Sequence, residues 1–424
     1  MTGVFRHRDF VLLWAGLTVS DLGNAVTFVA LPLVAVLALH ATAFQVGLIS
    51  AAASFAWLVI ALPAGVWVDR SRRRHVMIAS DAARAVLMAS IPVAWWLGML
   101  TVAQLIVVSL LVGVGTVLFT IADTAFLPDV LPRERLADGN GAMQASTAVS
   151  NITGAGLAGM LVQVIGAPAA LLVDAVSFVV SAGSVGAMRT QETPVLRPAQ
   201  RPRLLTEVRE GVRYVFRTPL PRTLAIGLCL CNMVLGGYDT VVILFLARQL
   251  HLPAGLIGVL FAVGSVGGLV GSVLAARIAR MVGDARALVL ATAVLAAGGL
   301  LLPWTRPGFG LAWFVVGSLL LSASIGVFNV CVLTALQSTV PAHLLGRVSA
   351  STRTFTRGAI PVGALLAGAL ATWLPPRWAL LIMMVSVLPV VAVFRFSPLG
   401  RVRTVAELHP TPTDTAVEPL AAEA

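Results

Sequence analysis

The sequence contains no lysine, and charged residues of any kind make up only 11% of its 424 residues. Soluble domains carry about a quarter charged residues, so this composition argues against a soluble globular protein. The absence of lysine also excludes a phosphate-binding loop of the G-x-x-x-x-G-K-[ST] type and any Schiff-base mechanism. Cysteine is scarce as well, because Cys229, Cys231 and Cys331 are the only three and all fall within apolar runs. Such positions are typical of small buried side chains rather than of a metal or redox site.

Apolar runs dominate the chain, which is 58% hydrophobic. A membrane-spanning helix needs roughly 20 mostly apolar residues, and the sequence offers twelve runs of about that length. We therefore predict an all-α membrane protein. The predicted spans are 10–38, 44–67, 76–98, 102–127, 140–165, 168–188, 222–247, 254–276, 286–304, 309–333, 348–373 and 377–396.

The basic residues predict the topology. All 29 are arginine and give a formal net charge of +11, yet with a cytoplasmic N-terminus the outer loops hold only Arg248, Arg306 and Arg377. This is the positive-inside bias of membrane proteins. We therefore expect a multi-pass protein of a bacterial plasma membrane with both termini cytoplasmic. The positive charge is expected to set the topology and to interact with the lipid bilayer, and no nucleic-acid partner is expected.

One long gap, residues 189–221, divides the spans into six and six. The segment "LLTEVREGVRYVFR" (204–217) within it has apolar residues at helical spacing, which predicts an amphipathic helix on the cytoplasmic interface, although an unstructured basic linker is the alternative. After Pro398 the chain loses its apolar runs and is expected to be disordered. The predicted organisation is a six-helix bundle (1–188), a central loop (189–221), a second six-helix bundle (222–396) and a disordered cytoplasmic tail (397–424).

The two halves repeat each other weakly at a period of about 210 residues. "GLTVSD" (16–21) is similar to "GLCLCN" (227–232), and "DVLPRERLADG" (129–139) is similar to "STVPAHLLGR" (338–347). This indicates a duplicated bundle with pseudo-symmetry.

The turn after the second span has the pattern G-x-x-x-D-R-x-x-R-R. It resembles motif A of the major facilitator superfamily, G-x-L-x-D-R-x-G-R-[KR], with Arg72 in place of the glycine. "DRSRRR", "LPDVLPRERL", "LLVDAVSF" and "QSTVPAHLLGRVSA" resemble the drug and siderophore exporter branch, the group that includes enterobactin exporters and macrolide efflux proteins. The resemblance implies twelve transmembrane helices in two pseudo-symmetric six-helix bundles. The motif residues are Gly65, Asp69, Arg70, Arg73 and Arg74.

In this superfamily the motif A aspartate is thought to contact the start of span eleven, here Arg347 to Thr354, when the cytoplasmic side is closed. Asp69 is unfavourably placed for the dipole of its own helix and needs such a partner, which predicts a gate latch. The alternative is that the arginines only set the topology and Asp69 is solvated. The second-half counterpart keeps Gly271 but has alanine in place of the acid.

Acids inside the spans are the candidates for coupling, because a charge in hydrocarbon is costly. Asp21 lies about 17 Å into the first span, close to the midplane. A carboxylate in such surroundings can load and release protons near neutral pH, although an interhelical hydrogen bond is the competing role. Asp81 and Arg84 are expected to form a structural pair, and Asp123 either a helix-end pair with Arg133 or Arg135 or a chemical site. The proton-coupling candidates are Asp21, Asp239 and Asp174.

Two further family motifs are only partly present. No arginine lies in the middle of span four, where family exporters often carry one, so the usual proton relay is in doubt. Span five has Gly154, Gly156 and Gly159 in "NITGAGLAGM", which resembles the exporter motif G-P-x-x-G-G with Ala155 replacing proline. These are predicted interface glycines, and simple bundle packing explains them equally well. "PVGALLAG" (361–368) in span eleven is similar.

A cavity with a few polar groups among apolar ones suits amphipathic substrates, cationic or neutral. Besides the acids, the candidates for its lining are Asn24, Phe28, Asn151, Asn232, Tyr238, Phe328 and Asn329.

The resulting prediction is a secondary active transporter that exports small amphipathic molecules such as drugs, antibiotics or siderophores, coupled to protons. A lipid-class flippase or a solute importer on the same fold is the alternative, and a non-transporting sensor or scaffold is a third. We expect no enzymatic activity, no cofactor and no metal site. The expected partners are a small-molecule substrate and protons, with the protein acting as a monomer.

Overall fold

The structure is a computed structural model that describes residues 3–190, 192, 213–340 and 342–408. Within these ranges the chain folds into helices without any strand. Eleven of the helical segments are long and apolar enough to cross a membrane, and Ala43–Val59 is a shorter apolar helix. Together they account for the twelve predicted spans, so the all-α membrane prediction is confirmed.

The first half contains six spans. They are formed by α1 (Arg8–Leu33) with the π-helical turn Val34–Ala38, α2 (Ala43–Val59) with α3 (Ala61–Asp69), α4 (Arg73–Trp96), α5 (Val102–Val130), α6 (Leu136–Ile165), and α7 (Ala167–Ala170) with α8 (Leu172–Gly186).

The second half repeats this arrangement. Its spans are α10 (Pro219–Leu244) with the π-helical turn Phe245–Gln249, α11 (Ala254–Val282), α12 (Asp284–Leu301), α13 (Leu311–Thr339), α14 (Ala342–Trp373), and α15 (Pro376–Val385) with α16 (Leu388–Phe396). Several helices continue past the predicted spans at one end. For example, α11 runs to Val282 rather than to 276, because a helix can continue into its polar flank beyond the apolar stretch.

Proline explains two of the interruptions. Pro63 has no N–H to donate to the carbonyl of Val59, and α2 ends there before α3 resumes at Ala61. Pro389 likewise has no N–H to donate to the carbonyl of Val385, four residues earlier, and it separates α15 from α16. Both breaks lie inside spans that the apolar pattern predicts as single segments.

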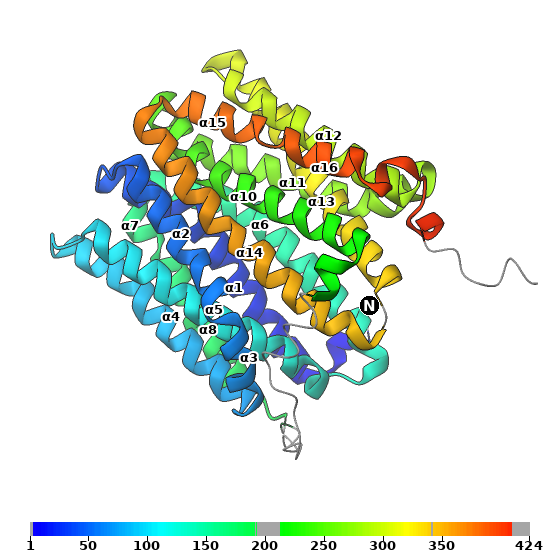
Figure 1. Ribbon diagram of the computed structural model, residues 1–424. Helices are drawn as coiled ribbons and strands as arrows, with labels where there is room; N and C mark the ends of the chain where they lie inside the picture. The colour runs from blue at the N-terminus through cyan, green and yellow to red at the C-terminus, as the bar shows by residue number, and fades with distance from the viewer. Residues whose placement is uncertain (1–2, 191, 193–212, 341, 409–424) are drawn as a thin grey trace, which may run out of the picture.

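Loops lie at two ends of the bundle. We call the end that holds the loops after α3, α5, α8, α11 and α13 the Arg-rich end, and the opposite end, with the loops after α1, α4, α6, α10, α12 and α14, the Arg-poor end. Figure 1 shows the first half in blue to teal and the second in green to red. The orange α14 lies beside the blue α2 along the interface between the halves, which we call the seam. The other extensive contact between the halves joins α6 and α11, and α10 makes smaller contacts with α1 and α2.

The halves meet closely toward the Arg-poor end. A Cβ atom on Gly47 of α2 would lie 2.7 Å from the carbonyl oxygen of Ala364, and one on Gly159 of α6 would lie 2.5 Å from that of Ala254. Only glycine allows helices to approach this closely. Beside these contacts, Arg248 of the second half donates a hydrogen bond of 2.5 Å to the carbonyl of Ala41 in the first. The Arg-poor end is therefore closed.

Pseudo-symmetry is visible in the backbone. His40 and His251 are the two non-glycine residues with positive φ in the described chain, at 49° and 53°, and each follows the π-helical turn that ends the first span of its half. Their separation matches the repeat of about 210 residues predicted from the sequence. The first span of each half therefore ends in the same backbone geometry.

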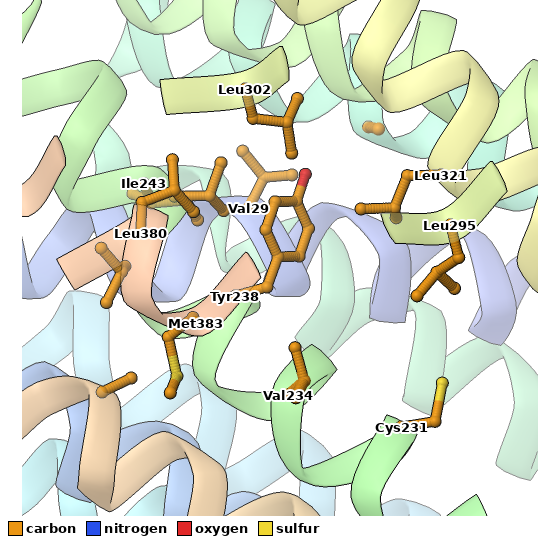
Figure 2. Close-up of a cluster of buried hydrophobic side chains, with 14 of the residues drawn as sticks. Val29, Cys231, Val234, Tyr238, Ile243, Leu295, Leu302, Leu321, Leu380 and Met383 are labelled. Carbon is orange, nitrogen blue, oxygen red and sulfur yellow. The ribbon is translucent and has the colours of Figure 1, made fainter. Parts of the chain in front are cut away.

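The core of the second half is built on α10. Figure 2 shows Tyr238, Val234 and Cys231 of this helix among Leu321, Leu295 and Leu302, with Leu380 and Met383 from α15 and with Val29 from α1 of the other half. These buried side chains make a continuous apolar layer. α10 is thus held on several sides, which places its polar residues firmly.

Most of the central loop and the far C-terminus, including most of the predicted amphipathic helix at 204–217, lie outside the described residues; residues 213–217 are helical. The expectation of disorder after 397 is wrong for residues 397–408. Leu399 and Val405 are buried, and the Val405 N–H donates to Asp284 at the start of α12. Hydrogen bonds from Thr404 and Arg403 to Glu407 hold the pKa of that carboxyl below its usual value. Two apolar anchors are enough to order a short polar segment.

Candidate functional site

Three connected cavities lie between and within the halves. The central cavity, about 790 Å³, separates α6 from α11, and the N-side cavity, about 450 Å³, lies among α1, α5 and α6. The C-side pocket, about 220 Å³, lies among α10, α11 and α13. Gln144 lines both of the first two, and Phe28 and Phe261 line the central cavity and the C-side pocket. The three spaces therefore form one continuous site.

The site reaches toward the Arg-rich end. The N-side cavity extends to Leu127, Pro128 and Leu136, beside the loop at 131–135, and from there to Asp21 and Asn24. Near Gly159 and Gly258 the helices α6 and α11 touch, whereas from Gln144 to Asn151 the central cavity lies between them. The helices thus diverge from the closed end toward the Arg-rich end.

Asp21 lies in the wall of the N-side cavity. Its carboxylate accepts a hydrogen bond of 2.6 Å from the Thr147 hydroxyl, which links α1 to α6. Asp123 of α5 lines the same cavity, and its Oδ1 is buried with no hydrogen-bond partner among the described residues. It does not pair with Arg133 or Arg135, because it faces the cavity rather than the helix end. Two carboxyl groups therefore share one chamber.

Arg84 is the basic residue of this region. It pairs with Asp81 one turn earlier on α4, and its guanidinium is held between the rings of Phe119 on α5 and Phe178 on α8, 4.7 and 4.3 Å from their centroids. Both members of the pair are buried, and Arg84 also lines the N-side cavity. The predicted pairing is present, and its Arg84 member is part of the cavity wall.

Asp174 lies deeper within the first half. It accepts hydrogen bonds from the Thr27 hydroxyl at 2.5 Å and from the Ser177 hydroxyl at 3.1 Å, and it is fully buried between α1 and α8. It does not line any of the three cavities. Its geometry is that of an interhelical bond.

Asp239 belongs to the C-side pocket. The pocket places this acid beside Tyr238, with Phe28 from α1 and Phe261 from α11 forming an edge-to-face ring pair, centroids 6.1 Å apart, across the seam. The coupling candidates Asp21 and Asp239 are therefore in different compartments of one continuous site.

The predicted lining residues divide into two groups. Asn24, Asn151 and Asn329 line the N-side or central cavity, as Phe28 and Tyr238 line the C-side pocket. Two expectations need correction. Phe328 is buried against Phe394 inside the second half, because its position on α13 faces the core, and Asn232 donates to the carbonyl of Leu228 on its own helix and lines none of these cavities.

Motif A fastens helix ends together. The Arg73 guanidinium forms an ion pair of 2.9 Å with Asp129 at the end of α5, and Arg74 donates to the carbonyls of Val185 and Gly186 at the end of α8. Cations are favourable at helix C-termini, where carbonyls lack helical partners. Glu192 accepts from the backbone N–H groups of Arg73 and Arg74 at the start of α4.

The latch prediction stays a prediction. The side chains of Asp69 and of most of the expected contact segment, Arg347 to Thr354, lie outside the described residues. Among the described residues, no atom lies within 4 Å of where a Cβ on the motif glycine Gly65 would stand, and α3 packs mainly against α5. Arg70 is exposed.

The span-five glycines have different neighbours. Gly159 touches Gly258 of the other half, and Gly156 faces Ala262 at 3.8 Å, so both lie at the interface. The assignment is wrong for Gly154, which packs inside the first half because Ala25 of α1 would be 2.5 Å from its Cβ. Span eleven repeats the pattern: Gly368 packs against Gly47 across the seam, and Gly363 against Met233 of its own half.

Several lining residues escaped the sequence analysis. Gln144 and Thr147 line the site together with Asn151, and their spacing of three and four along α6 is a signal of one polar helix face. The sequence predicts a structural pair for Arg84 and a helix-end pair or a chemical site for Asp123, but it does not predict that both residues line the cavity. Nothing local to α4 could show that Arg84 meets the cavity, because that depends on how α4 packs against α5 and α8.

Twelve spans in two similar halves, with cavities between and within them, are the architecture of a membrane transporter. The profile of the Major Facilitator Superfamily matches residues 13–364, and the chain belongs to this family. Its members move solutes across membranes and are not enzymes.

Sequence relatives agree with this family. The chain is 28% identical to the multidrug efflux pump Tap of Mycolicibacterium fortuitum over 88% of this chain and 91% of that protein. It is 24% identical to the uncharacterized MFS-type transporter YfiS of Bacillus subtilis, over 89% and 91% of the two chains.

Solved structures share the fold at low identity. The nucleoside transporter NupG superposes with a TM-score of 0.75 at 11% identity, over 91% of this chain and 98% of its own. A bacterial homologue of the iron transporter ferroportin, in an inward-facing state, gives 0.73 at 16% identity over the same shares.

Proposed function

We propose that this protein is a proton-coupled exporter of small amphipathic molecules in a bacterial plasma membrane, with the Arg-rich end and both termini in the cytoplasm. The name of the Mycolicibacterium fortuitum relative, a multidrug efflux pump, supports export and a broad substrate range. One chain supplies both halves of the site, which supports a monomer as the working unit.

The observation that carries the proposal is a cavity that extends to the Arg-rich end, is closed at the other, and has the Asp21 carboxylate in its wall. Arginine is retained on the cytoplasmic side of membranes, so the cavity in this state faces the cytoplasm. An exporter loads its substrate from that side. The largely apolar lining with a few amides suits amphipathic molecules.

Asp21 is the proposed proton carrier. It is accessible from the cavity and bonded by the hydroxyl of Thr147, a neutral donor that can stabilise either protonation state by rotating. A charged carboxylate without a cationic partner is costly in an apolar interior, so proton binding changes the free energy of the site. The hydrogen bond joins Asp21 to α6, and α6 also contacts α11 of the second half. Protonation of Asp21 can therefore affect how the two halves pack against each other.

The test is transport in a bacterium that lacks its major efflux pumps. Accumulation of a panel of amphipathic dyes and drugs should fall when the protein is expressed, and a protonophore should restore it. Asp21→Asn should abolish this gradient-driven export, with the folded protein retained as judged by size-exclusion chromatography. Asp284→Asn, which alters an acid outside the cavities, is the control and should export normally.

Three outcomes contradict the proposal in distinct ways. Unchanged accumulation across the panel contradicts efflux of these compounds. Increased accumulation, or scrambling of a labelled lipid, indicates the importer or flippase alternative. Full export by Asp21→Asn excludes this residue as the carrier and leaves efflux itself standing.

A further inference from the structure

Asp239 is the only acid within the apolar spans of the second half, because the other one in residues 222–396, Asp284, stands at the start of α12. Within the described chain its carboxylate accepts no hydrogen bond and has no ion pair. In the first half, Thr147 bonds Asp21, Arg84 pairs with Asp81, and Thr27 bonds Asp174. Asp123 also lacks a hydrogen-bond partner among the described residues, but its cavity is lined by Arg84 as well. Asp239 differs from Asp123 in that no basic residue lines its pocket.

Its pocket offers no counter-charge. No arginine or histidine lines the C-side pocket or the central cavity that continues from it. The hydroxyls of Ser265 and Ser318 in the lining donate instead to the carbonyls of Phe261 and Val315 on their own helices. An isolated carboxylate in an apolar pocket carries a large desolvation cost, which a cation in the pocket would offset.

Aromatic rings surround the place where such a cation would sit. Phe28, Phe261, Phe314 and Tyr238 all line the pocket, and Phe28 is 48% exposed although it lies inside the bundle. Figure 2 shows the Tyr238 ring among Val29, Leu302 and Leu321, so this wall is closely packed. Aromatic faces attract organic cations, and the attraction is strongest where water is excluded.

The pocket is also the blind end of the site. Asp239 is five residues before the end of α10, near the Arg-poor end where Arg248 and the interface glycines close the halves. A volume of about 220 Å³ accommodates an alkylammonium group with part of a ring, and the adjoining 790 Å³ accommodates the rest of a drug-sized molecule. The residues shared by the two spaces, Phe28 and Phe261 among them, lie at their junction.

We propose that Asp239 binds the protonated amine of the substrate, with Phe28 and Phe261 against its apolar body, so that the C-side pocket selects organic ammonium ions. This inference rests on the proposed function and names its substrate class. It separates the roles of the two halves: the carboxyl groups of the first half handle protons, and Asp239 recognises the cationic group of the cargo.

Equilibrium binding to the purified full-length protein tests this directly. The probes are two dansyl amides with the same fluorophore, one with a dimethylaminopropyl arm that is cationic at neutral pH and one with an isobutyl arm that is uncharged. Wild-type protein should bind the cationic probe at least about tenfold more tightly, which corresponds to about 1.4 kcal/mol. Asp239→Asn should remove this preference and leave the affinity for the neutral probe unchanged.

Two variants serve as controls. Asp239→Glu keeps the charge and should retain the preference, and Asp284→Asn should bind both probes as the wild type does. The inference is overturned if wild type does not discriminate between the probes, or if Asp239→Asn weakens both equally, which indicates a structural role. It is also overturned if Asp239→Asn keeps the preference but loses protonophore-sensitive export, which makes Asp239 a proton site. Cellular export is measured separately, so loss of the proposed function is distinguishable from loss of this site.

Discussion

At the residue scale, the described part of the first half combines one buried ion pair with several acids that have no cationic partner. Arg84 is the single base among Asp21, Asp81, Asp123 and Asp174, and two aromatic rings hold it in place. In the superfamily pattern an arginine on the fourth span is common, and this chain has none there. Arg84 reaches the same cavity from the third span, where Gly115 of α5 leaves room for its side chain, since a Cβ there would be 2.8 Å from Arg84 Cγ.

This pairing predicts a double-mutant result. Arg84→Met leaves Asp81 buried without its cation and should destabilise the protein by about 3–5 kcal/mol, whereas Arg84→Met with Asp81→Leu removes both charges and should recover most of that loss. The thermal unfolding midpoint of the detergent-purified protein measures both. A double variant as unstable as the single one would show that the guanidinium supports the fold through Phe119 and Phe178 rather than through Asp81.

At the element scale, the seam between halves has two kinds of glycine. Gly159 already touches the other half at the closed Arg-poor end, whereas Gly65 on α3, at the Arg-rich end, has no described atom within 4 Å of where its Cβ would stand. This difference follows if the seam closes at one end at a time. The glycine on α3 then has its close neighbour only in the opposite state.

Substitutions of these two glycines are therefore expected to affect stability and export differently. Gly159→Leu inserts a side chain where backbone atoms stand 2.5 to 2.9 Å away and should lower the unfolding midpoint, at a cost of about 1–3 kcal/mol. Gly65→Leu should leave the midpoint unchanged and slow export by blocking closure of the Arg-rich end. The measurements are thermal unfolding and dye-efflux rate. Wild-type efflux by Gly65→Leu would remove α3 from the closing motion.

At the scale of the whole molecule, twelve spans and the distribution of arginine predict the orientation in the membrane. The Arg-poor end holds Arg248, Arg306 and Arg377, and the other arginines of the described loops and helix ends lie at the Arg-rich end. Loop charge of this kind decides which side is retained in the cytoplasm.

Reporter fusions check this orientation. Green fluorescent protein fused after Ala424 should fluoresce, and alkaline phosphatase should be active when inserted after Arg306 and inactive after Arg135. The phosphatase requires the oxidising exterior to form its disulfides. Active phosphatase after Arg135 would invert the topology and turn the proposed export into import.

The amino-acid sequence alone determined the number of spans, their division into two halves, the repeat of about 210 residues and the class of protein. Hydrocarbon requires about 20 apolar residues per span, and this requirement acts on each segment independently of its neighbours. The breaks at Pro63 and Pro389 are local too, and their cause could be read from the chain.

Only the tertiary structure decided which polar residues share a site. Gly154 packs within a half while Gly159 spans the seam, Phe328 is core while Phe28 lines a cavity, and Arg84 enters the chamber of Asp21. Residues on apolar helices have similar local surroundings in sequence, and their faces are distinguished only by the rotation and packing of each helix against partners far along the chain.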